Sequence, residues 1–279
     1  MNLFYKALGS YYNEKIGEIL YNLYKSVGLS AFYNIMIKKV DIMRVLAIGC
    51  HPDDLEIACG GTLRKYVERG ADVFEAHVAN GNQGHVIIMP DELRDMRTKE
   101  AENAGKVLGV KEVFNIDVGD MCVDSHNQEV ICAVADVVSY CKPDVIITHN
   151  DEDYMQDHTE TCRLACNGSF ASGLAHMNRE GEAFSSFIPV FFMDTLAGVN
   201  FQPSIYVDIT NQIDKKIEAL NCHESQLKWM FEHDGIDFAD MVKTCSKYRG
   251  YQCGVPFAEG FRPYNVYPRY STKSLLPLD

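Results

Sequence analysis

The sequence is poor in basic residues and contains no basic cluster. Lysine and arginine together number 26 against 39 aspartates and glutamates, so the chain of 279 residues carries a formal net charge of −13. Because clustered lysine and arginine are needed to bind phosphate groups, this balance argues against a nucleic-acid partner and against an anionic membrane surface.

Disulfide and redox motifs are also missing. The ten cysteines include no CxxC pair, and several of them lie inside apolar helix or strand patterns. Such cysteines are typical of buried thiols in a reducing compartment, so we expect a cytoplasmic protein.

No uninterrupted apolar run is long enough to cross a membrane. The first forty residues are apolar, but charged residues interrupt them at Lys6, Glu14, Lys15, Glu18 and Lys25. No small-residue cleavage site follows, so we expect neither a membrane span nor a signal peptide. Leucine, tyrosine and isoleucine recur there at helical spacing, which predicts an N-terminal helical extension over residues 1–40. It either docks on a second subunit, giving a homo-oligomer, or covers the sheet edge.

The rest of the chain, residues 41–279, is predicted to be one α/β domain. Its composition, 47% hydrophobic and 23% charged, is that of a globular protein with a sizeable core. Strand patterns at 43–49, 72–79, 112–116 and 144–149 alternate with helical patterns at 60–69, 91–108, 126–141 and 157–172. This alternation predicts a Rossmann-like, mostly parallel sheet flanked by helices. Beyond residue 175 we expect an apolar run at 189–193, a strand at 205–209, and helices near 211–233 and 236–248.

A metal-type motif follows the first predicted strand. His51, Asp53 and Asp54 come directly after the apolar run 45–48, and ligands of open α/β sheets bind at the carboxyl ends of strands. His51 and Asp54 are three residues apart across a turn, so one metal ion can take both as ligands. Neighbouring side chains diverge, which leaves Asp53 free to act as a general base. The alternative is that an aspartate caps the helix expected near Gly60.

A second cluster follows the strand at 144–149. The segment from His149 to His158 reads HNDEDYMQDH. Since a catalytic zinc commonly takes three protein ligands, His158 would complete the set begun by His51 and Asp54. Asp157 either orients an imidazole or caps the following helix.

Together these motifs resemble the PIG-L, or LmbE-like, family of zinc-dependent N-acetylglucosaminyl deacetylases. The resemblance covers roughly residues 43–230 and rests on HPDDLEIACGGTL, on RTKE followed by LGV, on PDVIITH leading into DYMQDH, and more weakly on VDIT, KIEAL and HESQ. It implies a Rossmann-like sheet and the removal of an acetyl group from N-acetylglucosamine-type sugars. It further implies that His51, Asp54 and His158 bind zinc and that Asp53 is the base. Arg97 and Glu100 would lie near the pocket, or form a structural ion pair.

One position departs from the family pattern. Met155 stands where the family often has a histidine that stabilises the tetrahedral oxyanion. Losing one oxyanion donor typically costs about a hundred- to a thousandfold in rate. The candidates to replace it are Tyr154, His149, His85, His223 and Arg97.

We therefore expect a metal-dependent hydrolase acting on a small amino-sugar substrate, with Asp157, Arg97, Tyr154 and His85 near the metal or the substrate. The alternatives are an amidase for a larger acyl group or a thiol conjugate, and a non-catalytic zinc-containing sugar-binding protein. Two histidines and an aspartate favour zinc, although iron or cobalt fits the same ligands.

Overall fold

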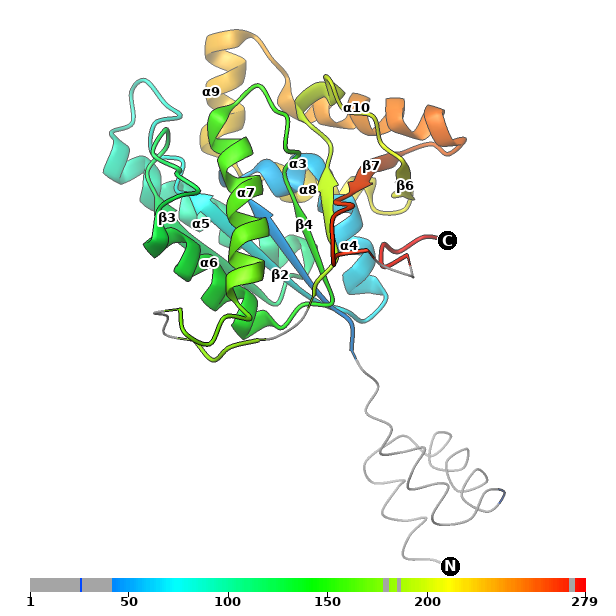
Figure 1. Cartoon of the computed structure of the whole chain (residues 1–279). Helices are drawn as coiled ribbons and strands as arrows, with labels where there is room; N and C mark the ends of the chain where they lie inside the picture. Colours follow the sequence, from blue (N-terminus) through cyan, green and yellow to red (C-terminus); the bar gives the residue numbers. More distant parts are fainter. Residues whose placement is uncertain (1–25, 27–41, 178–180, 185–186, 271–273) are drawn as a thin grey trace, which may run out of the picture. The chain divides into compact units, whose positions relative to one another are not determined.

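A mixed seven-stranded sheet organises the part of the chain that the structure, a computed structural model, describes (Figure 1). The described residues are 26, 42–177, 181–184, 187–270 and 274–279. Apart from Ser26, the predicted N-terminal extension lies outside them. Residues Met43–Asp279 form one compact unit.

The strands are β1 (Arg44–Gly49), β2 (Asp72–Ala79), β3 (Glu112–Val118), β4 (Val145–Thr148), β5 (Val190–Met193), β6 (Ile205–Asp208) and β7 (Ala258–Pro263), and they lie in the order β3-β2-β1-β4-β5-β7-β6. Strands β1 to β5 run parallel to one another, and Val45 in β1 lies opposite both Val73 and Val145. Strand β7 runs antiparallel to β5 and β6. The expected Rossmann-like, mostly parallel α/β sheet is confirmed.

The helices are α3 (Asp54–Ala58), α4 (Gly60–Glu68), α5 (Pro90–Leu108), α6 (Gln128–Cys141), α7 (Gln156–Ala171), α8 (Ile213–Leu220), α9 (Glu224–Asp234) and α10 (Phe238–Cys253), with a short 3-10 turn η1 (Leu196–Gly198). Because side chains alternate along a strand, β1 contributes to two cores. Leu46 and Ile48 pack with α6 and α7, whereas Val45 and Ala47 pack with α4 and α8. None of the helices in the described residues has the length and apolar character needed to cross a membrane.

Two local features differ from the sequence-based prediction. The helix expected at 60–69 is preceded by the separate helix α3, whose N-cap Asp53 makes no side-chain capping bond. The capping alternative for the HPDD motif is therefore wrong. The amides at the start of α4 instead bind a distant carboxylate, because Gly61 N and Thr62 N donate to the two oxygens of Glu259 at 2.9 and 2.7 Å. Strand β7, which carries Glu259, had not been expected.

Candidate active site

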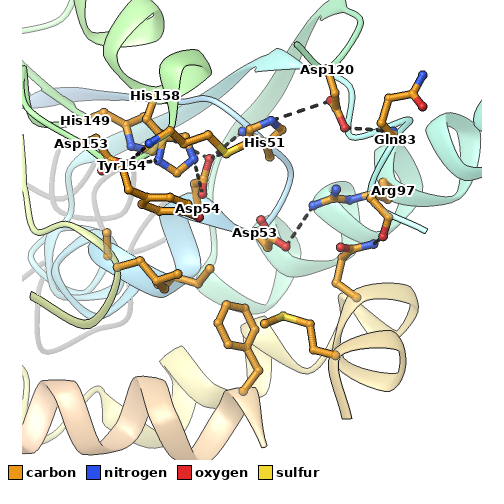
Figure 2. Close-up of a pocket in the computed structure, with 18 of the residues that line it drawn as sticks. His51, Asp53, Asp54, Gln83, Arg97, Asp120, His149, Asp153, Tyr154 and His158 are labelled. Carbon is orange, nitrogen blue, oxygen red and sulfur yellow. Dashed lines mark hydrogen bonds and ion pairs between the residues drawn. The ribbon is translucent and has the colours of Figure 1, made fainter. Parts of the chain in front are cut away.

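Two histidines and an aspartate from the two predicted clusters meet at the carboxyl ends of neighbouring strands β1 and β4 (Figure 2). His51 Nδ1 lies 3.5 Å from Asp54 Oδ2, and His158 Nε2 lies 3.5 Å from Asp54 Oδ1. All three side chains are buried or nearly so and line one pocket. Their ligand atoms lie within 4.8 Å of one another, so this set of two imidazoles and a carboxylate can bind one metal ion.

Each imidazole has a carboxylate near its other nitrogen. Asp153 Oδ1 lies 3.1 Å from His158 Nδ1, and Asp157 Oδ2 lies 3.5 Å from His51 Nε2. This arrangement is typical of metal-binding histidines, whose outer nitrogen is oriented by a carboxylate. Asp157 is not the N-cap of α7, since that position belongs to Met155.

Other donor sets overlap with this one. Cys50, His51 and Asp157 are also close enough to share an ion, as are His149, Asp153 and His158. Cys50 and Asp157 do not line the pocket. His149 Nε2 already accepts a hydrogen bond from Cys50 N at 2.9 Å. Among these three sets, only the one containing Asp54 both lines the pocket and keeps its imidazole nitrogens free of backbone donors.

Asp53 and Asp54 diverge as expected, and their surroundings shift their pKa values in opposite directions. Burial raises the pKa of Asp53 to about 6, although the charge of Arg97 acts against this rise. Burial also opposes the ionisation of Asp54, but the imidazoles of His158 and His149 outweigh it and hold its pKa well below the usual range. Adjacent carboxyl groups separated in this way suit different chemical roles.

Arg97 bridges the turn after β1 and the loop after β2. Its Nη2 atom donates to Asp53 Oδ2 at 2.9 Å and also to Pro52 O, while Nη1 donates to Gly81 O at 3.3 Å. Arg97 is only 3% exposed and lines the pocket. Arg97 therefore lies at the pocket, and its ion pair is with Asp53 and not with Glu100.

Further buried contacts connect Arg97 and Asp53 to helix α9. Glu100, one turn after Arg97 on α5, accepts from Ser225 N at 2.8 Å and from Ser225 Oγ at 2.7 Å. His223 Nε2 lies 3.3 Å from Glu56 Oε2, and both side chains are fully buried. Burial opposes a charge on His223, but Glu56 outweighs it and raises the His223 pKa. We call Asp53, Arg97, Glu100, Ser225, His223 and Glu56 the supporting network.

The remaining predicted residues divide into two groups. Tyr154, Met155 and His149 line the pocket, and the Tyr154 ring lies edge-on to His158 with 5.8 Å between centroids. His85 does not line it, because its Nδ1 accepts from Ile87 N and Ile88 N and its ring contacts Trp229. His223 is likewise outside the lining. The expectation that His85 lies near the substrate is therefore not met.

The sequence analysis missed Asp120. This residue follows β3, lines the pocket and accepts from Gly81 N at 2.8 Å and from Gln83 N at 2.9 Å (Figure 2). Its Oδ1 atom lies 3.8 Å from His51 Nε2. The signal that could have identified it is the one used for His51, an acidic residue just beyond the carboxyl end of a parallel strand.

Comparison with known proteins agrees with this geometry. Residues 46–167 match the family model described as PIG-L: GlcNAc-PI de-N-acetylase. The chain is 28% identical over 232 residues to a diacetylchitobiose deacetylase from Thermococcus kodakarensis, covering 80% of this chain and 83% of that relative. A 4-oxalmesaconate hydratase from Pseudomonas putida is 24% identical over 191 residues, covering 65% of this chain and 73% of that relative.

A solved structure shares the fold. The N,N'-diacetylchitobiose deacetylase from Pyrococcus horikoshii matches with a TM-score of 0.71 at 24% sequence identity, covering 86% of this chain and 96% of that chain. The segment that matches the family model contains both metal-type clusters, from His51 to His158. The resemblance seen in the motifs is thus confirmed, because residues 46–167 match the PIG-L family model.

Proposed function

We propose that this protein is a metal-dependent deacetylase that removes the N-acetyl group from an N-acetylglucosamine-type amino sugar or its conjugate. The observation that carries the proposal is the convergence of His51, Asp54 and His158 beside Asp53, a second carboxylate with its own partner. The relatives named as deacetylases of acetylated amino sugars support the same reaction class.

The metal site fits zinc by its donor set. Two imidazole nitrogens and one carboxylate, with a pocket on the open side, are the ligands of a catalytic zinc site, and iron or cobalt fits them too. When bound, such an ion polarises a carbonyl and lowers the pKa of water.

Asp53 moves the proton. Water adds to the carbonyl carbon of the amide, and Asp53 accepts a proton from it. The C–N bond then breaks, and Asp53 returns the proton to the leaving nitrogen, so the products are acetate and the free amine. A carboxyl group whose pKa is raised toward neutrality is suited to both transfers.

Tyr154 is the best candidate to replace the family's oxyanion-stabilising histidine. Met155 has no proton to donate, His85 and His223 lie outside the pocket lining, and Arg97 is committed to Asp53. His149 Nε2 accepts the Cys50 amide. The Tyr154 side chain lines the pocket, and its hydroxyl is a donor.

The charge of the pocket favours a neutral amide over a polycarboxylate such as 4-oxalmesaconate. Five aspartates line it, namely Asp53, Asp54, Asp120, Asp153 and Asp194. Among the described residues of the lining, Arg97 is the one lysine or arginine, and it is already paired with Asp53. A metal ion and the pairs Asp53–Arg97 and Asp194–Arg249 would offset part of this negative charge, and the remaining carboxylates would repel a polyanionic substrate.

Acetate release by zinc-loaded protein from a panel of N-acetylhexosamines and their glycosides tests the proposal. We expect turnover that Asp53→Asn abolishes while zinc stays bound. Tyr154→Phe should lower kcat about a hundred- to a thousandfold. Tyr248→Phe, an exposed tyrosine outside the pocket lining, is the matched control and should match the wild type. Absence of acetate release at full zinc occupancy would refute the deacetylase assignment and favour an amidase for a larger acyl group or a non-catalytic sugar-binding protein.

A further inference from the structure

The pocket has an apolar wall that the deacetylase reaction does not require. Five residues from four elements form it, namely Ile57 and Ala58 from α3, Leu196 from η1, Met230 from α9 and Phe238 from α10. Ile57, Leu196, Met230 and Phe238 also pack in one hydrophobic cluster around Leu220 and Val242. The wall is therefore one side of a packed core, and it offers a continuous apolar surface to a ligand.

This wall begins next to the reacting centre. Ile57 and Ala58 follow the metal-ligand candidate Asp54 by three and four residues on the same short helix, so they lie one turn away from it. The polar groups suited to sugar hydroxyls come from other elements. Gln83 and Asp120 belong to the loops after β2 and β3, and Figure 2 shows them with Arg97 on one side of Asp53.

The free space is larger than an acetyl methyl needs. The pocket has a volume of about 370 Å³. Ile57, Ala58 and Leu196 also border a second cavity of about 30 Å³. Its other walls include the charged side chains of Asp194, Lys216, Arg249 and Glu259, so the apolar surface available to a ligand is the one in the first pocket.

Met155 is a further apolar residue of the pocket lining. It lines the pocket at the position where the family often has an imidazole. A thioether side chain is flexible and packs against irregular apolar groups. The substitution thus removes a proton donor and adds a surface suited to an alkyl chain.

We propose that the enzyme hydrolyses the same sugar amide more efficiently when the acyl group is an alkanoyl chain longer than acetyl, with its alkyl part against Ile57, Leu196, Met230 and Phe238. The proposal rests on the proposed amide hydrolysis and specifies its substrate. An amide has one substituent on its nitrogen and one on its carbonyl carbon. The amino sugar on the nitrogen needs polar partners, which the side with Gln83 and Asp120 supplies, so the acyl chain takes the apolar wall. The C–N bond breaks as before, and the carboxylate product carries the longer chain.

The test compares N-acetyl-, N-propanoyl-, N-butanoyl- and N-hexanoylglucosamine as substrates of the zinc-loaded full chain, with amine release as the readout. We expect kcat/KM to rise about fourfold per added methylene up to butanoyl, which corresponds to burial of one CH₂ group. Met230→Gln should flatten this rise. Phe231→Gln is the matched control, because Phe231 is the next residue of α9, is 62% exposed and is not part of the lining.

The outcomes separate this proposal from the proposed function. Hydrolysis of the acetyl compound with much slower hydrolysis of the longer chains would overturn the alkanoyl assignment and leave the deacetylase intact. No hydrolysis of any compound would overturn both. Octyl and methyl glycosides of N-acetylglucosamine form the second arm of the test. If the octyl group raises kcat/KM and Met230→Gln removes that gain, the wall binds the aglycone, and the alkanoyl proposal is wrong.

Discussion

Replacing Arg97 by methionine should remove the group that positions Asp53 and leave metal binding unchanged. The substitution keeps most of the apolar stem but removes the guanidinium, which binds Asp53, Pro52 and Gly81 at once. Removing one partner of a buried ion pair costs about 3–5 kcal/mol. We therefore expect the melting temperature to fall by about 6–20 °C, at roughly 2–4 °C per kcal/mol.

Turnover should fall further than stability alone explains. Each hydrogen bond to a charged group contributes about 1.5–3 kcal/mol, and 1.36 kcal/mol is tenfold in rate. If the guanidinium holds Asp53 in its working position, Arg97→Met lowers kcat about ten- to a hundredfold at unchanged zinc content. Arg97→Lys keeps the charge but loses the planar fork, so its kcat should lie between those of the wild type and Arg97→Met.

The assay is acetate release at a temperature where each variant is folded, with zinc measured on the same samples. The ligand candidates His51, Asp54 and His158 are untouched by the substitution, so zinc binding serves as the internal control. If Arg97→Met keeps kcat within about threefold of the wild type at full zinc occupancy, Asp53 does not depend on the guanidinium, and the reasoning fails.

Three further predictions concern buried charge and metal. Burial and the nearby charge of Glu56 raise the pKa of Glu75 well above its usual 4.5, and neither of its oxygens has a hydrogen-bond partner. Because the folded-state pKa is raised, the cost of ionising Glu75 is absent below the unfolded pKa and grows as pH increases. Glu75→Gln should therefore increase the free energy of unfolding at neutral pH, and this increase should shrink toward pH 4.5. Denaturant unfolding at several pH values measures it. An increase that does not change with pH would contradict the prediction. Lys216→Met leaves the buried Glu259 without its cation and should lower the free energy of unfolding by about 3–5 kcal/mol. The double variant Lys216→Met/Glu259→Gln should recover part of this loss in the same measurement. Chelation should lower the melting temperature and added zinc should restore it, an effect that His158→Ala should abolish.

The sequence was sufficient to predict the parallel strands of the sheet and the close approach of the two clusters that contain His51 and His158. Strands β1 and β4 are short apolar runs followed at once by His51 and His149, and the parallel arrangement brings such carboxyl ends to one edge. This is why His51, Asp54 and His158 could be placed together before any coordinates. Their roles as ligands stay a prediction until a metal is measured.

The antiparallel edge and the apolar wall could not be predicted in the same way. Strand β7 reads AEGFRP and contains glycine and proline, so it shows no alternation of polar and apolar residues. Met230 and Phe238 reach the pocket only because α9 and α10 pack over α3. Which distant helix closes a pocket depends on tertiary packing, and helical periodicity does not encode it.

The backbone conformation of Asp53, in the motif HPDDLE, gives the residues of the motifs RTKE and HESQ a structural role. Asp53 has φ of 125°, a conformation rare for a residue with a side chain. Such strain costs on the order of 1–3 kcal/mol and persists only where the surroundings hold it. The supporting network supplies that hold, since Arg97 binds the carboxylate, Glu100 ties α5 to Ser225, and His223 ties α9 to Glu56 on α3. The strained turn is what points Asp53 away from Asp54, so one carboxylate binds Arg97 while its neighbour faces the two imidazoles. The residues of the weaker motifs therefore hold Asp53, the proposed base, in its position.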